Sequence, residues 1–124
     1  AEVPEDSDIH QRASRTDVEV TALSQMEAEL QSKISKGESI GPGSSLMKNM
    51  ASMLGQQIAA LRLEAMAYYG IPHNNRLWLD DENGVGPEPA QTAIGSYLNT
   101  RASSVYGGSR EVQKNIIAKT VLGL

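Results

Sequence analysis

The chain has 124 residues and no cysteine, which excludes disulfide bonds and any metal site built on cysteine. A net charge of −4 argues against binding to duplex nucleic acid, and no apolar run approaches the roughly 18–20 residues that a membrane span needs. Phenylalanine is also absent, so the core must be built from aliphatic residues and methionine, which favours packed helices. The acidic, polar N-terminal residues do not resemble a signal or transit peptide, and we expect a cytoplasmic protein.

The first half of the chain contains two predicted helices. Residues 1–6 are expected to be a flexible start, and the folded domain is expected to span 7–124. Apolar residues at steps of three and four predict a helix over about 8–36 with one polar face. After a glycine-rich turn, a second helix is predicted over 45–69. It is apolar around most of its circumference, which is typical of the central helix of a domain.

The second half contains a long loop and two shorter helices. The irregular stretch 70–88 carries Asn-Gly and Gly-Pro turn signals, and its length indicates a functional, mobile or partner-bound loop. A third helix is predicted over 89–103 and a fourth over 109–122. Four amphipathic helices in a chain of this length predict an all-α fold, an antiparallel four-helix bundle.

Three short motifs are better explained by structure than by chemistry. Ser45-Leu46-Met47-Lys48 matches the Ser-x-x-Lys pattern of penicillin-binding enzymes, but the companion motifs are missing. Ser44 or Ser45 is expected to cap the second helix, and Ser45 is therefore interpreted as a helix cap. The acidic run at 80–83 lacks the ligand spacing of a calcium loop, and His10 and His73 are isolated from each other in sequence. No metal site is predicted.

The turn into the last helix is the strongest candidate site. Gly107 and Gly108 let the backbone approach a ligand closely, and Ser109 begins a helix whose first N–H groups are unpaired. Arg110 adds a positive charge, in a segment (93–124) that carries four basic residues and one acid. This combination suits a phosphate or an enolate-like oxygen. An ordinary capped turn between two helices fits the same residues, and the residues alone leave both interpretations open.

Residues 101–124, RASSVYGGSREVQKNIIAKTVLGL, resemble the C-terminal signature of the acyl-CoA dehydrogenase family. The family pattern is Tyr, then Glu or Gly, then Gly, then Ser or Thr, any residue, Glu or Gln, Ile or Val, Gln, Arg or Lys, followed by an Ile-Ile-Ala helix. Three upstream stretches are also similar to the last four helices of that family: HQRA at 10–13, GPGSSLMK at 41–48 and LEAMAYYG at 63–70. The resemblance thus covers most of the chain and is strongest at its end.

The resemblance implies a flavoprotein that removes two hydrogens from the α and β carbons of an acyl-CoA thioester and uses FAD as its cofactor. It also implies that this chain forms the helical bundle domain of such a protein. It implies that Tyr106 and Gly107 lie beside the thioester, the N–H of Gly107 donating to the thioester carbonyl. The residues that the resemblance assigns to the cofactor are Gly108, Ser109, Arg110 and Glu111, with Ser109 and Glu111 at positions that contact the ADP part.

The catalytic base of the family is not found in this chain. One branch of the family carries a glutamate directly after the signature tyrosine, and Gly107 stands at that position here. The other branch carries the base on a helix that would lie upstream of Ala1. Some members also use a glutamine and paired glycines to contact FAD across a dimer interface. Because Glu64, Ala67 and Tyr68 occupy those positions, no FAD contact is predicted there.

Members of the family are much longer than this chain. We therefore expect the chain to be a C-terminal bundle of an acyl-CoA dehydrogenase that is inactive alone, does not retain FAD, and joins homo- or hetero-oligomers through its helices. Two alternatives remain open. One is a stand-alone helical interaction or oligomerisation module without enzymatic ancestry, and the other is a non-catalytic subunit of a heteromeric dehydrogenase.

Overall fold

The computed structural model describes residues 8–73 and 86–124. The expected flexible start at 1–6, the acidic run at 80–83 and most of the predicted loop at 70–88 lie outside these residues. Within the described ranges the regular structure is entirely helical, and four helices pack together, which confirms the predicted fold class. None of the described helices combines the length and the apolar character that crossing a membrane requires.

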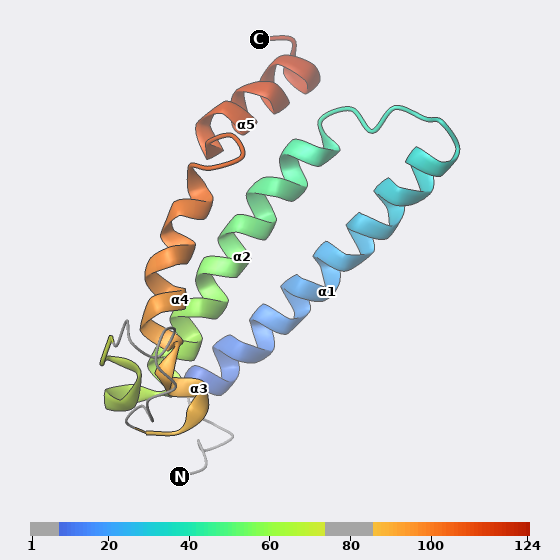
Figure 1. The fold of residues 1–124 in the computed structure, drawn as a ribbon. Coiled ribbons are helices and arrows are strands. Elements are labelled where there is room, and N and C mark those ends of the chain that lie inside the picture. The colour runs from blue at the N-terminus through green and yellow to red at the C-terminus, as the bar shows by residue number, and fades with distance from the viewer. Residues whose placement is uncertain (1–7, 74–85) are drawn as a thin grey trace.

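Helices α1 (Asp8–Ser35) and α2 (Gly43–Ala65) form an antiparallel hairpin (Figure 1). Gly37 follows α1 with a φ of +73°, a backbone conformation that favours glycine, and its N–H donates to the carbonyl of Ile34. At the other side of the connection, a Cβ on Gly43 would lie 2.6 Å from a methyl carbon of Leu30. The glycine therefore lets α2 begin close against the end of α1.

The predicted helix cap at Ser45 is wrong. The residue before α2 is Pro42, whose φ of −78° is already compatible with a helix, and no side chain caps this end. The carbonyl of Pro42 accepts from the N–H of Leu46, so Ser45 lies inside the first turn, where it is only 6% exposed. The helix begins earlier than expected because Pro42 and Gly43 permit it.

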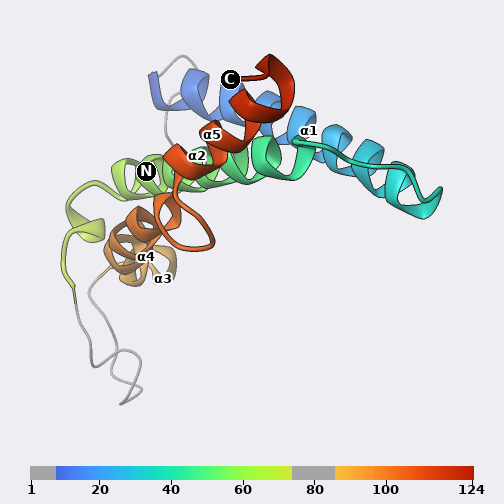
Figure 2. The ribbon, with the colours of Figure 1, turned by 90° about the horizontal axis from the view of Figure 1, so that it is seen from above.

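Helix α2 is the central helix, as the sequence predicts. Figure 2 shows α1 and α4 on opposite sides of α2, and α5 also packs against it. The buried apolar residues of the described chain are few, and half of them lie on this helix: Leu54, Ala59 and Leu61 of α2, with Leu30 of α1, Ala90 of α3 and Ala93 of α4. The core is therefore a thin layer on both sides of α2.

The predicted helix at 89–103 consists of three consecutive pieces: α3 (Glu88–Gln91), α4 (Ala93–Thr100) and a 3-10 turn, η3 (Arg101–Ser104). The first break falls at Thr92, which has φ −107° and ψ 2°. Arg62 of α2 donates hydrogen bonds to the carbonyl of Pro89 at 2.6 Å and to the hydroxyl of Thr92 at 2.7 Å. These tertiary bonds hold the chain in the broken conformation.

The predicted helices at 45–69 and 109–122 are also shorter as α-helices than expected. Met66 separates α2 from a 3-10 turn, η1 (Ala67–Gly70), whose first residue, Ala67, has a φ of +46°. At the end of the chain, α5 (Arg110–Ile117) continues as a π-helical turn, η4 (Ala118–Leu122), and ends at Gly123 with φ +68°. Ser109 caps α5 as predicted, its hydroxyl accepting from the N–H of Val112 at 3.4 Å.

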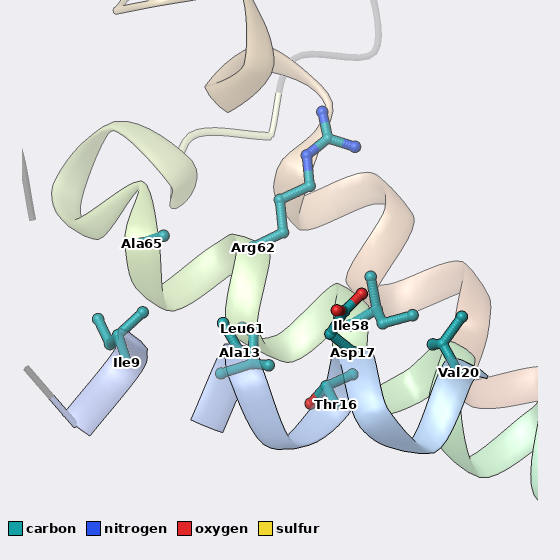
Figure 3. A pocket seen from close by; sticks show the side chains of 9 residues that line it. All are labelled: Ile9, Ala13, Thr16, Asp17, Val20, Ile58, Leu61, Arg62 and Ala65. Atoms are coloured by element: carbon teal, nitrogen blue, oxygen red, sulfur yellow. The ribbon is translucent and has the colours of Figure 1, made fainter. Parts of the chain in front are cut away.

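An apolar hollow of about 380 Å³ lies between α1 and α2 (Figure 3). Aliphatic side chains line most of it: Ile9, Ala13, Val20, Ile58, Leu61 and Ala65. Polar contacts join the two helices beside it. Arg12 pairs with Glu64 at 2.8 Å, and the amide of Gln57 donates to the hydroxyl of Thr16 at 2.6 Å. The ion pair is exposed to solvent, which weakens its contribution to stability.

Candidate functional site

The turn between η3 and α5 brings the predicted site residues together. Tyr106 is 60% exposed, and the backbone then passes through two positive φ values, +66° at Gly107 and +94° at Gly108. A Cβ would meet open space at Gly107, whereas at Gly108 it would collide with the side-chain amide of Gln113. The positive φ values favour glycine at both positions, and at Gly108 the end of the Gln113 side chain would also have to move.

Two adjacent N–H groups of this turn are free of partners among the described residues. The N–H groups of Val105 and Tyr106 both donate to the carbonyl of Ala102, at 2.9 and 3.0 Å. The N–H groups of Gly107 and Gly108 donate to no other residue of the described ranges. Unpaired N–H groups directly before a helix N-terminus form an arrangement that binds anionic oxygen.

The start of α5 already holds one carboxylate. Glu111 accepts hydrogen bonds from its own N–H and from the hydroxyl of Ser109, and these bonds lower the pKa of its carboxyl below the usual 4.5. The positive end of the helix favours the same negative charge. Glu111 therefore presents a charged hydrogen-bond acceptor beside the turn.

This arrangement predicts a pH-dependent contribution to stability. Because the folded state depresses the pKa of Glu111, its charge stabilises the fold above about pH 4.5 and the stabilisation disappears as the pH falls through the lower folded pKa. Glu111→Gln is expected to lower the free energy of unfolding at neutral pH and to have a smaller effect at an acidic pH, where the carboxyl is protonated in the folded state, measured by urea unfolding at both pH values. Glu29→Gln, on an exposed position of α1, is the control. An equal loss at both pH values would contradict the assignment.

Three polar side chains of α2, four residues apart, hold the turn and the 3-10 segment before it. The ammonium nitrogen of Lys48 donates to the carbonyls of Gly108 at 2.6 Å and Ser103 at 3.2 Å. The amide nitrogen of Gln56 donates to the carbonyls of Thr100 and Arg101 and to the hydroxyl of Ser103. The third residue is Ser52, which lies between Lys48 and Gln56 in the sequence and accepts from Arg110. Sequence reasoning missed this row, although polar residues at four-residue steps on an otherwise apolar helix are a usable signal.

The guanidinium of Arg110 belongs to the same row of contacts. It donates to the side-chain oxygen of Gln56 at 3.0 Å and to the hydroxyl of Ser52 at 3.4 Å. Arg101 likewise donates to the backbone carbonyl of Gln56 at 3.0 Å and stacks on the ring of Tyr97. The guanidinium groups of Arg101 and Arg110 therefore both contact neutral groups at the helix interface. The cofactor contact predicted for Arg110 stays a prediction.

The Ser-x-x-Lys pattern does not form a catalytic pair in the structure. Ser45 is buried, and the hydrogen bonds of Lys48 go to backbone carbonyls. Beside Lys48 lies a mainly apolar cavity of about 330 Å³ with Tyr106 on its wall and the small residues Ala51 and Gly55 opposite the 3-10 segment. In the part of the chain that the structure describes, no three acidic or histidine side chains gather closely enough to hold a metal ion.

The structure is an all-α domain of packed helices, and comparison with known families agrees with this fold class. The sequence model of the family "Acyl-CoA dehydrogenase, C-terminal domain" matches residues 2–122, so this chain belongs to the acyl-CoA dehydrogenase family through that domain.

Two curated relatives share a short stretch with the chain. Acyl-CoA dehydrogenase IpdE1 of Mycobacterium tuberculosis (strain ATCC 25618 / H37Rv) is 68% identical over 28 residues, which is 23% of this chain and 7% of the relative. The IpdE1 of Mycolicibacterium smegmatis (strain ATCC 700084 / mc(2)155) is 64% identical over 28 residues, again 23% of this chain and 7% of the relative. No solved structure gives a significant match.

Proposed function

We propose that this chain is the helical C-terminal domain of an FAD-dependent acyl-CoA dehydrogenase and that its Tyr106–Ser109 turn forms one wall of the catalytic site. The observation that carries the proposal is the pair of N–H groups at Gly107 and Gly108, which have no partner among the described residues and lie beside an exposed tyrosine, in a chain of this family. The N–H of Gly107 would donate to the thioester carbonyl. There it would stabilise the negative charge that develops on the carbonyl oxygen when the α-proton leaves.

The base that removes the α-proton is proposed to come from outside this turn. Gly107 has no side chain to supply it. Glu111 is a carboxylate close by in sequence, but its hydrogen bonds to Ser109 and to its own N–H favour the ionised form and lower its pKa. A carboxylate stabilised in this way is a weak proton acceptor, because a general base works best with a pKa near the working pH.

FAD would supply the two-electron acceptor for the hydrogen that leaves the β-carbon. The residues of this chain proposed to hold it are Gly108, Ser109, Arg110 and Glu111. The groups present fit an adenosine diphosphate: the Glu111 carboxylate can accept from ribose hydroxyls, and the N–H of Arg110, the first residue of α5, can donate to a phosphate oxygen. Arg110 takes part through its backbone N–H, because its guanidinium is bound to α2.

A second candidate function is a non-catalytic subunit that pairs with a catalytic homologue. Gly107, at the position where one branch of the family has its glutamate, favours this candidate. Assembly with further protein is also supported by exposed apolar side chains at the C-terminal end: Val112, Ile116, Val121, Leu122 and Leu124. We propose homo- or hetero-oligomerisation through the helices in either case.

A nuclear magnetic resonance titration of the ¹⁵N-labelled chain tests the proposed site. Butyryl-CoA is expected to shift the amide signals of Tyr106–Ser109 with a dissociation constant on the order of 1 mM, weak because one wall of the site acts alone. Free CoA, which lacks the thioester carbonyl, is the matched control and is expected to leave Gly107 unshifted. Saturable shifts confined to α1, or equal shifts of Gly107 with both compounds, would contradict the proposal.

A further inference from the structure

We infer that Lys48 is a positioning residue for this site: its ammonium group fixes the turn so that the backbone N–H groups at the start of α5 face away from α2 as hydrogen-bond donors. The inference rests on the proposed function and deepens it by naming the group that orients the donors. It concerns Lys48 of α2, which is separated from its acceptors by 55 and 60 residues of sequence.

The first argument is the position of the two acceptors. The carbonyl of Ser103 lies before the turn and the carbonyl of Gly108 lies at its end, and one ammonium nitrogen reaches both, at 3.2 and 2.6 Å. Both bonds are partly buried and one partner is charged, so each is stronger than an ordinary exposed hydrogen bond. Lys48 thus closes the turn by joining its two ends.

The second argument is the lack of other side-chain anchors. Gly107 and Gly108 have no side chains with which to hold their own conformation, and Tyr106 is 60% exposed. In the described ranges, Lys48 makes the only side-chain hydrogen bond to the backbone of residues 105–108. Gln56 acts on the segment before the turn and Arg110 on the helix after it. The orientation of the peptide between Gly108 and Ser109 therefore depends on Lys48.

The third argument is peptide geometry. The peptide bonds of the described chain are trans, so the C=O and N–H of one peptide unit point in opposite directions. Since the carbonyl of Gly108 points to Lys48, the N–H of Ser109 must point away from it. A carbonyl that accepts from a cation is also polarised, which makes the N–H of the same peptide unit a stronger donor. Lys48 thereby adds donor strength as well as orientation.

Three variants of Lys48 separate positioning from simple packing. Lys48→Met removes the donors and the charge, Lys48→Gln keeps a donor without the charge, and Lys48→Arg keeps both. The control is Lys36→Met, on an exposed position in the connection after α1. Amide spectra of the ¹⁵N-labelled chain are expected to show shifts at residues 103–109 of the Met variant, besides those next to position 48 itself. The Ser109 amide proton should move upfield, and Lys48→Arg should restore the wild-type signals at 103–109.

Titration with butyryl-CoA then links the turn to binding. Lys48→Met is expected to bind about tenfold more weakly, equivalent to about 1.4 kcal/mol, while Lys48→Arg stays within about threefold of the wild type. Unchanged spectra at 103–109, or unchanged affinity when those signals do shift, would overturn the inference.

Two further outcomes have distinct meanings. Loss of helicity by circular dichroism in both the Met and Gln variants would place Lys48 among the residues needed for folding and overturn its positioning role. If butyryl-CoA shifts no amide signal of the wild-type chain, the proposed function is refuted, and with it the proposed role of the turn in binding. The spectra of the Lys48 variants would still show whether the ammonium group of Lys48 holds the conformation of the turn. The two proposals therefore fail in different measurements.

Discussion

Leu54→Ala is expected to lower the free energy of unfolding by about 3 kcal/mol and the midpoint of thermal unfolding by roughly 10 °C. Leu54 is 6% exposed on the central helix, so the substitution removes buried methyl groups and leaves a cavity. The effect is large because the core of the described chain contains few buried apolar side chains, and three of them are leucines. Urea and thermal unfolding followed by circular dichroism measure it.

The control for Leu54 is its neighbour Met53. Met53 lies on the same helix but is 57% exposed, so Met53→Ala is expected to cost less than about 1 kcal/mol. The comparison separates burial from helix propensity, because both variants place alanine in the same helical turn. Equal losses at the two positions would mean that the thin core along α2 does not carry the stability of the chain.

Gln56→Leu is expected to cost about 2 kcal/mol and to loosen the chain from η3 to the start of α5. The half-buried Gln56 donates to the carbonyls of Thr100 and Arg101 and accepts from Arg110, so leucine leaves several polar groups without a partner at once. Hydrogen exchange should therefore speed up in residues 100–112 and remain unchanged in α1. Chemical denaturation gives the free energy, and amide exchange gives its location.

Two further variants serve as a control and a comparison for Gln56→Leu. Gln31→Leu, on an exposed position of α1, changes the same side chain without removing a tertiary contact and is expected to be nearly neutral. Gln56→Glu keeps an oxygen for Arg110 but turns the donor toward backbone carbonyls into an acceptor. We expect it to lose the bonds to η3 and to keep the bond to α5. Uniform acceleration of exchange over the whole chain in Gln56→Leu would refute a local role.

The elements that could be predicted from the sequence are those whose signals are local. Apolar residues at helical spacing predict α1 and α2, and the apolar circumference of α2 predicts its central place. The two glycines at 107 and 108 predict the turn, because positive φ values favour glycine, and Ser109 predicts the cap of α5. In each case the physical cause lies within a few residues of its effect.

The features that could not be predicted depend on contacts between distant residues. The helix at 89–103 breaks at Thr92, where Arg62 of α2 holds the break. In the same way, Arg110 is an apparent anion-binding side chain in sequence, but its immediate partners in the structure are Ser52 and Gln56. Local propensity contains no information on such partners. The roles of Tyr106 and Gly107 toward a substrate likewise stay predictions, since they depend on a molecule that the sequence only implies.

The row of Lys48, Ser52 and Gln56 makes the length of α2 as important as its composition. These residues bond to the chain between Thr100 and Arg110 with overlapping sets of partners, and they lie along one side of the helix because they are four residues apart. A deletion or insertion of one residue between Lys48 and Gln56 would rotate one of them by about 100° away from its partners. Evolution can therefore exchange many side chains of this helix, but it cannot change the number of residues along this part without releasing the turn.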